Sequence, residues 1–273
     1  MPDPPFHRPI GMPFIELQAI DSTNNYAFSH IHAGLAQHGS IIFSHEQTSG
    51  KGQRGKKWIS APGDNISLSI IIKPTSLLVP QQFQLSACVA VALHKFFEKY
   101  AGTQTKIKWP NDLYWKDRKA GGILIESIVR SSESGVGSSE SGVLSRESGV
   151  GTWEWAVIGI GININQTSFP PELPNPVSLK QITGKNFDTV ELAKELCQVF
   201  NDHFEKLINN GFEDVYAQYL SHLYKKNEKV KLKKDTGVFE TMIKTVSPTG
   251  KLIVQHGIDE EFDFGSVEWI ITH

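Results

Sequence analysis

The chain has 273 residues, of which 39% are hydrophobic and 21% are charged, and its formal net charge is −2. This length is typical of one large domain with a smaller one, and the apolar share is sufficient for a hydrophobic core. The nearly neutral balance of charge argues against a nucleic-acid-binding surface.

Two features of the sequence concern the compartment. Cys88 and Cys197 lie far apart in segments with helical periodicity, which favours free buried thiols in a reducing compartment over a disulfide or a metal site. The proline-rich start has no apolar signal segment, and no run of about 18 apolar residues follows it. We therefore expect a cytoplasmic protein that does not cross a membrane.

The first part of the chain predicts strands and helices in alternation. An irregular, proline-rich arm is expected over 1–13, and a glycine-rich loop over 47–57. β-branched residues favour strands, and apolar residues at helical spacing favour helices. The expected elements are strands over 14–20, 39–46 and 65–73, and helices over 26–34 and 81–100.

The stretch KIKWPNDLYWKDRKAGGILIE, residues 106–126, is the most unusual part of the chain. Two apolar strands are expected there, separated by Trp-Pro-Asn-Asp and a charged turn that ends at Lys119. Pro110 stiffens the turn, and Gly121 and Gly122 let the backbone pass close to another group. Polar groups crowded between two such apolar strands are expected to face a ligand.

The second part begins with three near-copies of a heptad, SSESGVG, SSESGVL and SRESGVG, over 131–151. Such a composition buries too little apolar surface to offset its ordering entropy, which predicts a mobile loop. A strand over 153–164 and helices over 188–209 and 212–223 are expected next. From residue 225 short alternating strands with glycine turns predict a small β-barrel.

Several motifs have both a functional and an ordinary interpretation. The run from Gly50 to Gly55 has G-x-G-x-x-G spacing, but no helix follows it, so it is either an anion-binding loop or a surface turn. The cluster of Asn111, Asp112, Lys108, Arg118 and Lys119 could be an ordinary surface ion pair. Residues 22–24 could be a simple helix cap.

The strand over 153–164 has a distinctive alternation. Gly159, Gly161, Asn163 and Asn165 share one of its faces, because side chains alternate along a strand. A face without bulky side chains leaves room either for a flat ligand or for a packing helix.

Together, four stretches resemble the biotin–protein ligase family: DSTNNYA (21–27), QTSGKGQRGKKW (47–58), KWPNDLYWKDRKAGGILIE (108–126) and VIGIGININ (157–165). The resemblance implies an α+β fold, in which a class II synthetase-like mixed β-sheet is flanked by helices. It places a catalytic domain over 14–223 and a small SH3-like β-barrel over 224–273.

The family forms biotinyl-5′-AMP from biotin and ATP with Mg²⁺, and then transfers biotin to one lysine of a biotin carboxyl carrier domain. The resemblance assigns catalysis to Lys119, which contacts the reacting carboxylate and α-phosphate, and to Asp112, which orients or deprotonates the acceptor amine. The implied biotin contacts are Ser22, Thr23, Asn24, Gln47, Gly50, Lys51, Gly52, Gln53, Trp58, Lys119 and Gly122. The implied nucleotide contacts are Lys51, Gln53, Arg54, Asn111, Asp112, Lys119 and Asn163. No residue cluster has the pattern of a dedicated metal cage.

The sequence departs from the family pattern in its loop. Many members have G-R-G-R there, whereas this chain has Gly50-Lys51-Gly52-Gln53 followed by Arg54. Gln53 thus replaces an arginine that shields the adenylate, and we hypothesise that Arg54 or Lys51 substitutes for it; the alternative is faster release of the adenylate.

A second departure concerns length and partners. Bifunctional members carry an N-terminal helix-turn-helix, for which 13 residues leave no room, so we expect no DNA binding. A monomer or a homodimer is expected. The alternative functions are a lipoate–protein ligase, which shares the fold and the acyl-adenylate chemistry, and a non-catalytic biotin-binding protein.

Overall fold

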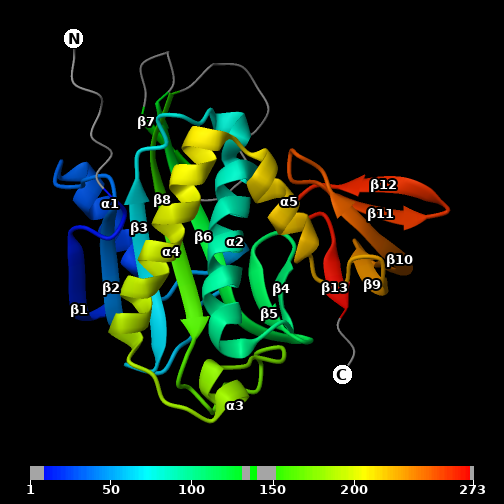
Figure 1. Ribbon diagram of the computed structural model, residues 1–273, viewed down its shortest axis with the longest axis horizontal. Coiled ribbons are helices and arrows are strands. Elements are labelled where there is room, and N and C mark those ends of the chain that lie inside the picture. Colours follow the sequence, from blue (N-terminus) through cyan, green and yellow to red (C-terminus); the bar gives the residue numbers. More distant parts are fainter. Residues whose placement is uncertain (1–8, 131–135, 140–151, 271–273) are drawn as a thin grey trace.

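The computed structural model describes residues 9–130, 136–139 and 152–270, which form a large mixed β-sheet, its helices and a second, smaller sheet (Figure 1). The large sheet has the order β1-β2-β3-β8-β6-β5-β4, with β7 paired to β6. Among the strands in the described ranges, only β1 and β2 of this sheet pair in parallel, and the other pairs are antiparallel. The strands are β1 (Phe14–Ile20), β2 (Ser40–Gln47), β3 (Asn65–Ile72), β4 (Thr105–Lys108), β5 (Asp112–Trp115), β6 (Arg118–Arg130), β7 (Val136–Ser139) and β8 (Thr152–Asn163).

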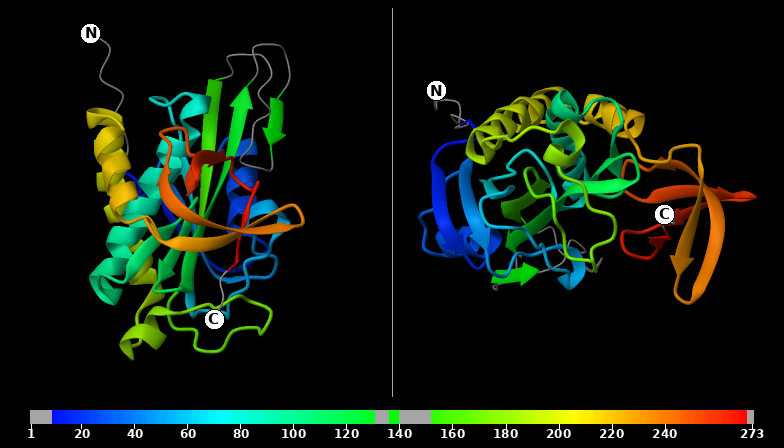
Figure 2. Two further views of the ribbon diagram at one scale, coloured as in Figure 1. Left: turned by 90° about the vertical axis from the view of Figure 1, so that its right-hand side faces the viewer. Right: turned by 90° about the horizontal axis from the view of Figure 1, so that it is seen from below.

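Helices cover the large sheet unequally on its two faces (Figures 1 and 2). The helices are α1 (Thr23–His32), α2 (Gln82–Ala101), α3 (Leu179–Thr183), α4 (Thr189–Asn210) and α5 (Glu213–Ser221). On β2, Ile41 and Phe43 belong to the main core beneath α2 and α4, whereas Ile42 packs with Ala27 of α1 on the other face. Because side chains alternate along a strand, one strand supplies both layers.

The second sheet has the order β12-β11-β10-β9-β13, and its recorded pairs are antiparallel. Its strands are β9 (Lys229–Lys234), β10 (Gly237–Val246), β11 (Leu252–His256), β12 (Ile258–Phe262) and β13 (Glu268–Ile270). Leu232, Ile243 and Val254 are fully buried in it. The predicted fold class, a mixed sheet flanked by helices with a small C-terminal β unit, is confirmed; the exact domain boundaries stay a prediction.

The turn between β4 and β5 joins the two sheets. The indole N–H of Trp109 donates to the carbonyl of Gly250, 2.8 Å away, and the Trp109 ring meets the edge of Phe264. The hydroxyl of Tyr219 in α5 donates to the carbonyl of Pro110 at 2.9 Å. The turn is therefore held from both sides, which fixes the residues that follow it.

The stretch 106–126 forms three strands, so the prediction of two strands was wrong. Residues 109–111 are a turn between β4 and β5, and Lys116, with a φ of 52°, is in the turn between β5 and β6. Strand β5 has only four residues, too few for its alternation to be recognised in the sequence. Helix α3 was not predicted either, and α1 begins at Thr23 rather than at Tyr26.

The heptad repeat is described only at Val136–Ser139, where β7 pairs with the end of β6. The prediction of a loop is wrong for these four residues, because a β-ladder needs backbone groups and not apolar side chains. The rest of the repeat, 131–135 and 140–151, lies outside the described residues, as do residues 1–8 of the predicted arm.

Two expectations about composition can be compared with the structure. Cys88 and Cys197 are free and buried in α2 and α4, as predicted. Within the described ranges, none of the helices has the length and apolar character needed to span a lipid bilayer.

Candidate active site

A cleft of about 1110 Å³ lies over the large sheet and is bordered by residues of the second sheet. Beneath the cleft runs a row of residues paired across neighbouring strands: Asp112 with Gly122, Gly122 with Gly161, and Gly161 with Ser67. The next row pairs Leu124 with Gly159 and Gly159 with Ser69. Paired residues point to the same face, so glycines and serines leave this face open.

Part of the open face is occupied by two side chains of the protein. A Cβ atom added to Gly161 would lie 2.4 Å from the indole of Trp58, and one added to Gly159 would lie 2.5 Å from the amide oxygen of Asn24. The strand therefore does leave room, as predicted. Trp58 and Asn24 occupy part of this space and form one wall of the cleft.

A chain of hydrogen bonds runs along one end of the cleft. The side-chain oxygen of Gln47 accepts two hydrogen bonds from Thr23, one from its backbone N–H at 2.8 Å and one from its hydroxyl at 3.1 Å. Ser69 donates either to the Thr23 hydroxyl or to Asn24. Ser22 is the N-cap residue just before α1, but its buried hydroxyl makes no capping hydrogen bond. Its position therefore supports a ligand contact more than the simple cap considered from the sequence.

Glu126 continues this chain and was not among the predicted site residues. Its buried carboxylate accepts a hydrogen bond of 2.5 Å from Asn24 and lies 3.7 Å from the ammonium of Lys51. The sequence does contain one signal for Glu126. It is the lone acid after the apolar run Ile123–Ile125, and it shares a strand face with Gly122. Glu126 links the α1 end of the cleft to the glycine-rich loop.

The loop 50–58 folds back on itself at the edge of the cleft. The N–H of Trp58 donates to the carbonyl of Gly50, and a Cβ at Gly50 would lie 2.5 Å from the Trp58 carbonyl. Gln53 donates to the carbonyl of Ile123 at 3.3 Å, and Arg54 donates to the carbonyl of Gly265 at 2.7 Å. The loop therefore contacts both the large sheet and the second sheet.

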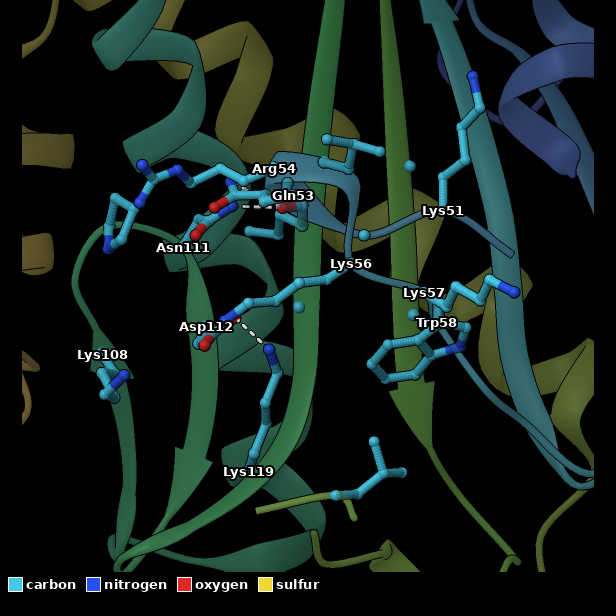
Figure 3. Close-up of a pocket in the computed structure, with 18 of the residues that line it drawn as sticks. Lys51, Gln53, Arg54, Lys56, Lys57, Trp58, Lys108, Asn111, Asp112 and Lys119 are labelled. Carbon is cyan, nitrogen blue, oxygen red and sulfur yellow. Dashed lines mark hydrogen bonds and ion pairs between the residues drawn. The ribbon is translucent and has the colours of Figure 1, made fainter. Parts of the chain in front are cut away.

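The other end of the cleft is cationic. The ammonium of Lys119 lies 2.7 Å from the carboxylate of Asp112, and Lys56 extends toward the same carboxylate (Figure 3). A Cβ at Gly122 would lie 3.1 Å from Asp112 and 3.5 Å from Lys119. The glycine thus allows the ion pair to lie flat on the sheet.

Lys108 is the third cation at this end. Its ammonium lies 5.1 Å from the ring centre of Tyr114 and 5.2 Å from that of Trp269. Burial, opposed by the carboxylate of Asp112 and aided by the cations Lys119 and Lys56, lowers the pKa of Lys108 to about 8.

The predicted nucleotide contacts Asn111 and Asn163 also line the cleft and support its backbone. The amide of Asn111 donates to the Ile123 carbonyl. The amide of Asn163 donates to the carbonyls of Val177 and Lys119 at 3.2 and 3.4 Å. Their role toward a nucleotide stays a prediction, as does every ligand contact assigned from the sequence.

The segment 264–270 borders the cleft as well, although no motif in the sequence indicated it. The indole N–H groups of Trp58 and Trp269 are buried and have no hydrogen-bond partner among the described residues. An unpaired buried donor costs about 1–3 kcal/mol, so two of them beside one cleft indicate donors available to a ligand.

Comparison with known proteins finds a related family. Residues 16–138 match the model of the biotin/lipoate A/B protein ligase family. Over these residues the chain resembles this family. It is 30% identical over 216 residues to the bifunctional ligase/repressor BirA of Bacillus spizizenii, which covers 78% of this chain and 60% of that protein. It is 26% identical over 246 residues to the biotin–[acetyl-CoA-carboxylase] ligase of Paracoccus denitrificans, covering 88% and 92%.

Solved structures of this ligase family share the fold. The biotin protein ligase from Aquifex aeolicus in complex with biotin and ATP aligns with a TM-score of 0.74 at 23% identity, covering 95% of this chain and 99% of that one. The chain spans between about half and three fifths of the length of the Bacillus and Escherichia coli BirA proteins that it matches.

We predict that Gly161→Ala lowers the free energy of unfolding by about 1–3 kcal/mol, because the new methyl group overlaps the Trp58 indole. Urea denaturation measures this loss. Gly237→Ala in β10 is the matched control, since its Cβ would meet only the Lys234 carbonyl at 3.7 Å. In a Trp58→Ala background, Gly161→Ala should cost much less; an equal cost in both backgrounds would contradict the contact.

Proposed function

We propose that this chain is an ATP-dependent biotin–protein ligase that forms biotinyl-5′-AMP and transfers biotin to a lysine of a biotin carboxyl carrier domain. One observation carries the proposal: a single cleft joins a hydrogen-bonding end, at Ser22, Thr23 and Gln47, to a cationic end at Lys119. Biotin has a polar ureido ring at one end and a carboxylate at the other. ATP brings phosphates to the carboxylate end.

The hydrogen-bonding end suits the ureido ring. Gln47 uses its oxygen to hold Thr23, which turns its amide nitrogen toward Gly50, and the Ser22 hydroxyl makes no capping bond. The indole of Trp58 supplies an apolar wall for the bicycle, whose burial contributes about 25 cal/mol per Å². A ureido polar atom left unpaired there would cost about 1–3 kcal/mol, which makes this set of partners selective.

The cationic end suits adenylation. An oxygen of the biotin carboxylate attacks the α-phosphorus of ATP, the bond to the β-phosphate oxygen breaks, and pyrophosphate leaves. Lys119 would offset the negative charge that gathers on the α-phosphate oxygens. Its position is fixed beforehand by the ion pair with Asp112 and by the hydrogen bond from its backbone N–H to the carbonyl of Asn175. Lys108 and Lys56 would balance the charge of the departing pyrophosphate.

Transfer needs an uncharged acceptor amine. A free lysine has a pKa of about 10.4, so it arrives protonated at neutral pH and must lose a proton before it attacks the acyl carbon and AMP leaves. Asp112 is the carboxylate beside Lys119 and is partly exposed to the cleft, so it would orient the incoming ammonium and accept the proton.

Mg²⁺ would enter with ATP as part of the substrate. Glu172 and Glu268 also line the cleft, and the carboxylates beside its lysines are engaged, Asp112 with Lys119 and Glu126 with Asn24 and Lys51. This fits a magnesium ion held mainly by phosphate oxygens rather than by a protein cage.

The first test is the mass of a biotin carboxyl carrier domain after incubation with the protein, biotin and ATP. We expect a gain equal to one biotinyl group, and a rate about 10²–10³-fold lower in Lys119→Ala, because a preorganised charge is lost. Lys206→Ala, which removes an exposed cation from α4, is the control and should leave the rate unchanged.

Two outcomes would reject the proposal: no mass gain, or a gain that Lys119→Ala does not slow. Replacing biotin by lipoate in the same assay tests the other substrate class of the family. If the protein lipoylates a lipoyl domain in preference to biotinylation, its function is that of a lipoate–protein ligase.

The lowered pKa of Lys108 predicts a pH dependence. Below pH 8 its ammonium is mostly charged and attracts phosphate; above pH 8 the charge is lost. We expect kcat/KM for ATP, which reports the free enzyme, to fall as the pH rises through about 8. In Lys108→Arg the guanidinium keeps its charge, so this fall should disappear. The same fall in both proteins would exclude Lys108 as its source.

The presence of Gln53 in place of the family arginine leads to a prediction about how the adenylate is retained. Arg54 and Lys51 both lie at the cleft, and Arg54 is fixed by its bond to Gly265. If these cations already shield the adenylate, Gln53→Arg releases preformed biotinyl-5′-AMP at the wild-type rate. Arg54→Ala should release it faster. Slower release from Gln53→Arg would mean that the shield is absent from the natural loop.

A further inference from the structure

A second group of chemically active side chains lies outside the cleft, between α2 and the end of α5. His94 and Glu98 are one turn apart on α2, and His222 follows the last residue of α5. One potential ligand atom from each residue lies within 4.8 Å of the others. None of the three lines the cleft, so the proposed ligase chemistry does not account for them.

We propose that His94, Glu98 and His222 bind one divalent transition-metal ion, with Zn²⁺ as the best match. Two imidazoles and one carboxylate are the ligand types that Zn²⁺ takes in proteins, and water would complete the set. Ligands four residues apart on a helix face the same side, which is the spacing of His94 and Glu98.

The ring of the buried His94 is held by a backbone carbonyl. The Nε2 atom of His94 lies 3.0 Å from the carbonyl of Thr105, a pure acceptor, so Nε2 carries the proton and Nδ1 keeps a free electron pair. A backbone carbonyl on the second ring nitrogen is the usual support of a metal-binding histidine. His94 is 1% exposed, which restricts the direction of this electron pair.

The charged side chains around the two imidazoles also bear on a bound cation. Lys95 and Lys106 face both rings and oppose an added positive charge. The Glu98 carboxylate, which has no hydrogen bond or ion pair among the described residues, would offset that repulsion.

Binding requires a small movement of His222. The two rings are stacked, with centres 3.8 Å apart and planes 25° apart, whereas an electron pair used for binding lies in the ring plane. Zinc–nitrogen distances of about 2.0–2.1 Å place tetrahedral ligands about 3.4 Å apart. His222 is half-buried at a helix end, so its ring can tilt away from the stack and bring its nitrogen to that distance from the other ligand atoms.

The ion would fasten α2 to the segment that leads into the second sheet. The carbonyl of His222 accepts the N–H of Ile107 in β4, and the N–H of Tyr224 donates to the Ile107 carbonyl. A metal at His222 would therefore stabilise the junction between the two sheets. Its role is structural, which separates this proposal from the ligase function.

The test is Zn²⁺ titration of the full-length, chelator-treated protein, by calorimetry and by thermal unfolding. We expect one ion per chain and a rise in Tm on zinc addition. In Glu98→Gln and in His222→Asn the affinity should fall by roughly tenfold or more, and the Tm rise should disappear. Both variants change partly exposed side chains, and the Tm of each without metal shows whether it has folded.

His32→Asn is the matched control, because it removes one exposed imidazole from α1 and leaves the cluster intact. It should bind zinc as the wild type does. Replacing Zn²⁺ by Co²⁺ should give visible absorption typical of tetrahedral coordination in the wild type and in His32→Asn only. Absence of binding, or equal binding by the wild type and Glu98→Gln, would overturn the proposal.

Discussion

The cleft depends on a strip of sheet from which almost no side chain rises. Strand β8 alternates Ile158, Ile160 and Ile162, all buried in the core, with Gly159 and Gly161 on the opposite face. One strand can therefore close the core and leave space for a ligand within the same few residues. Packing against a side chain enforces the pattern, because even a methyl group at Gly161 would overlap the Trp58 indole.

The side chains around this strip carry more positive than negative charge. Lys119 is neutralised by Asp112, whereas Lys108 is held mainly by the faces of Tyr114 and Trp269. Aromatic faces attract a cation without supplying a counter-charge, so the site keeps an excess of positive charge. Such an excess of positive charge is stabilised when phosphate binds, and burial, the main cause of the lowered pKa of Lys108, disfavours its ammonium before binding.

Long elements and local motifs could be predicted from the sequence; contacts between distant segments could not. The periodicity of α2 and α4 and the β-branched run of β3 located those elements to within one or two residues. The stretches around Gln47 and Lys119 indicated the site because their polar residues are consecutive in the chain. Glu126 was missed because a single acid in an apolar strand carries little local signal, and its partners Asn24 and Lys51 are distant in sequence.

The second sheet illustrates the same limit and also completes the site. Arg54, at a φ of 55°, reaches the carbonyl of Gly265, and a Cβ on Gly265 would lie 2.8 Å from its guanidinium. Gly265 itself has a φ of 81°, so glycine is required there both for the backbone and for this close approach. The loop that borders the cleft is thus positioned by a turn more than 200 residues later. Because Lys108 and Trp109 contact Trp269 and Gly250, the cationic end depends on the same sheet. The cleft is therefore complete only when the two sheets are joined, and the segment at His222 is one of the places where that junction is made.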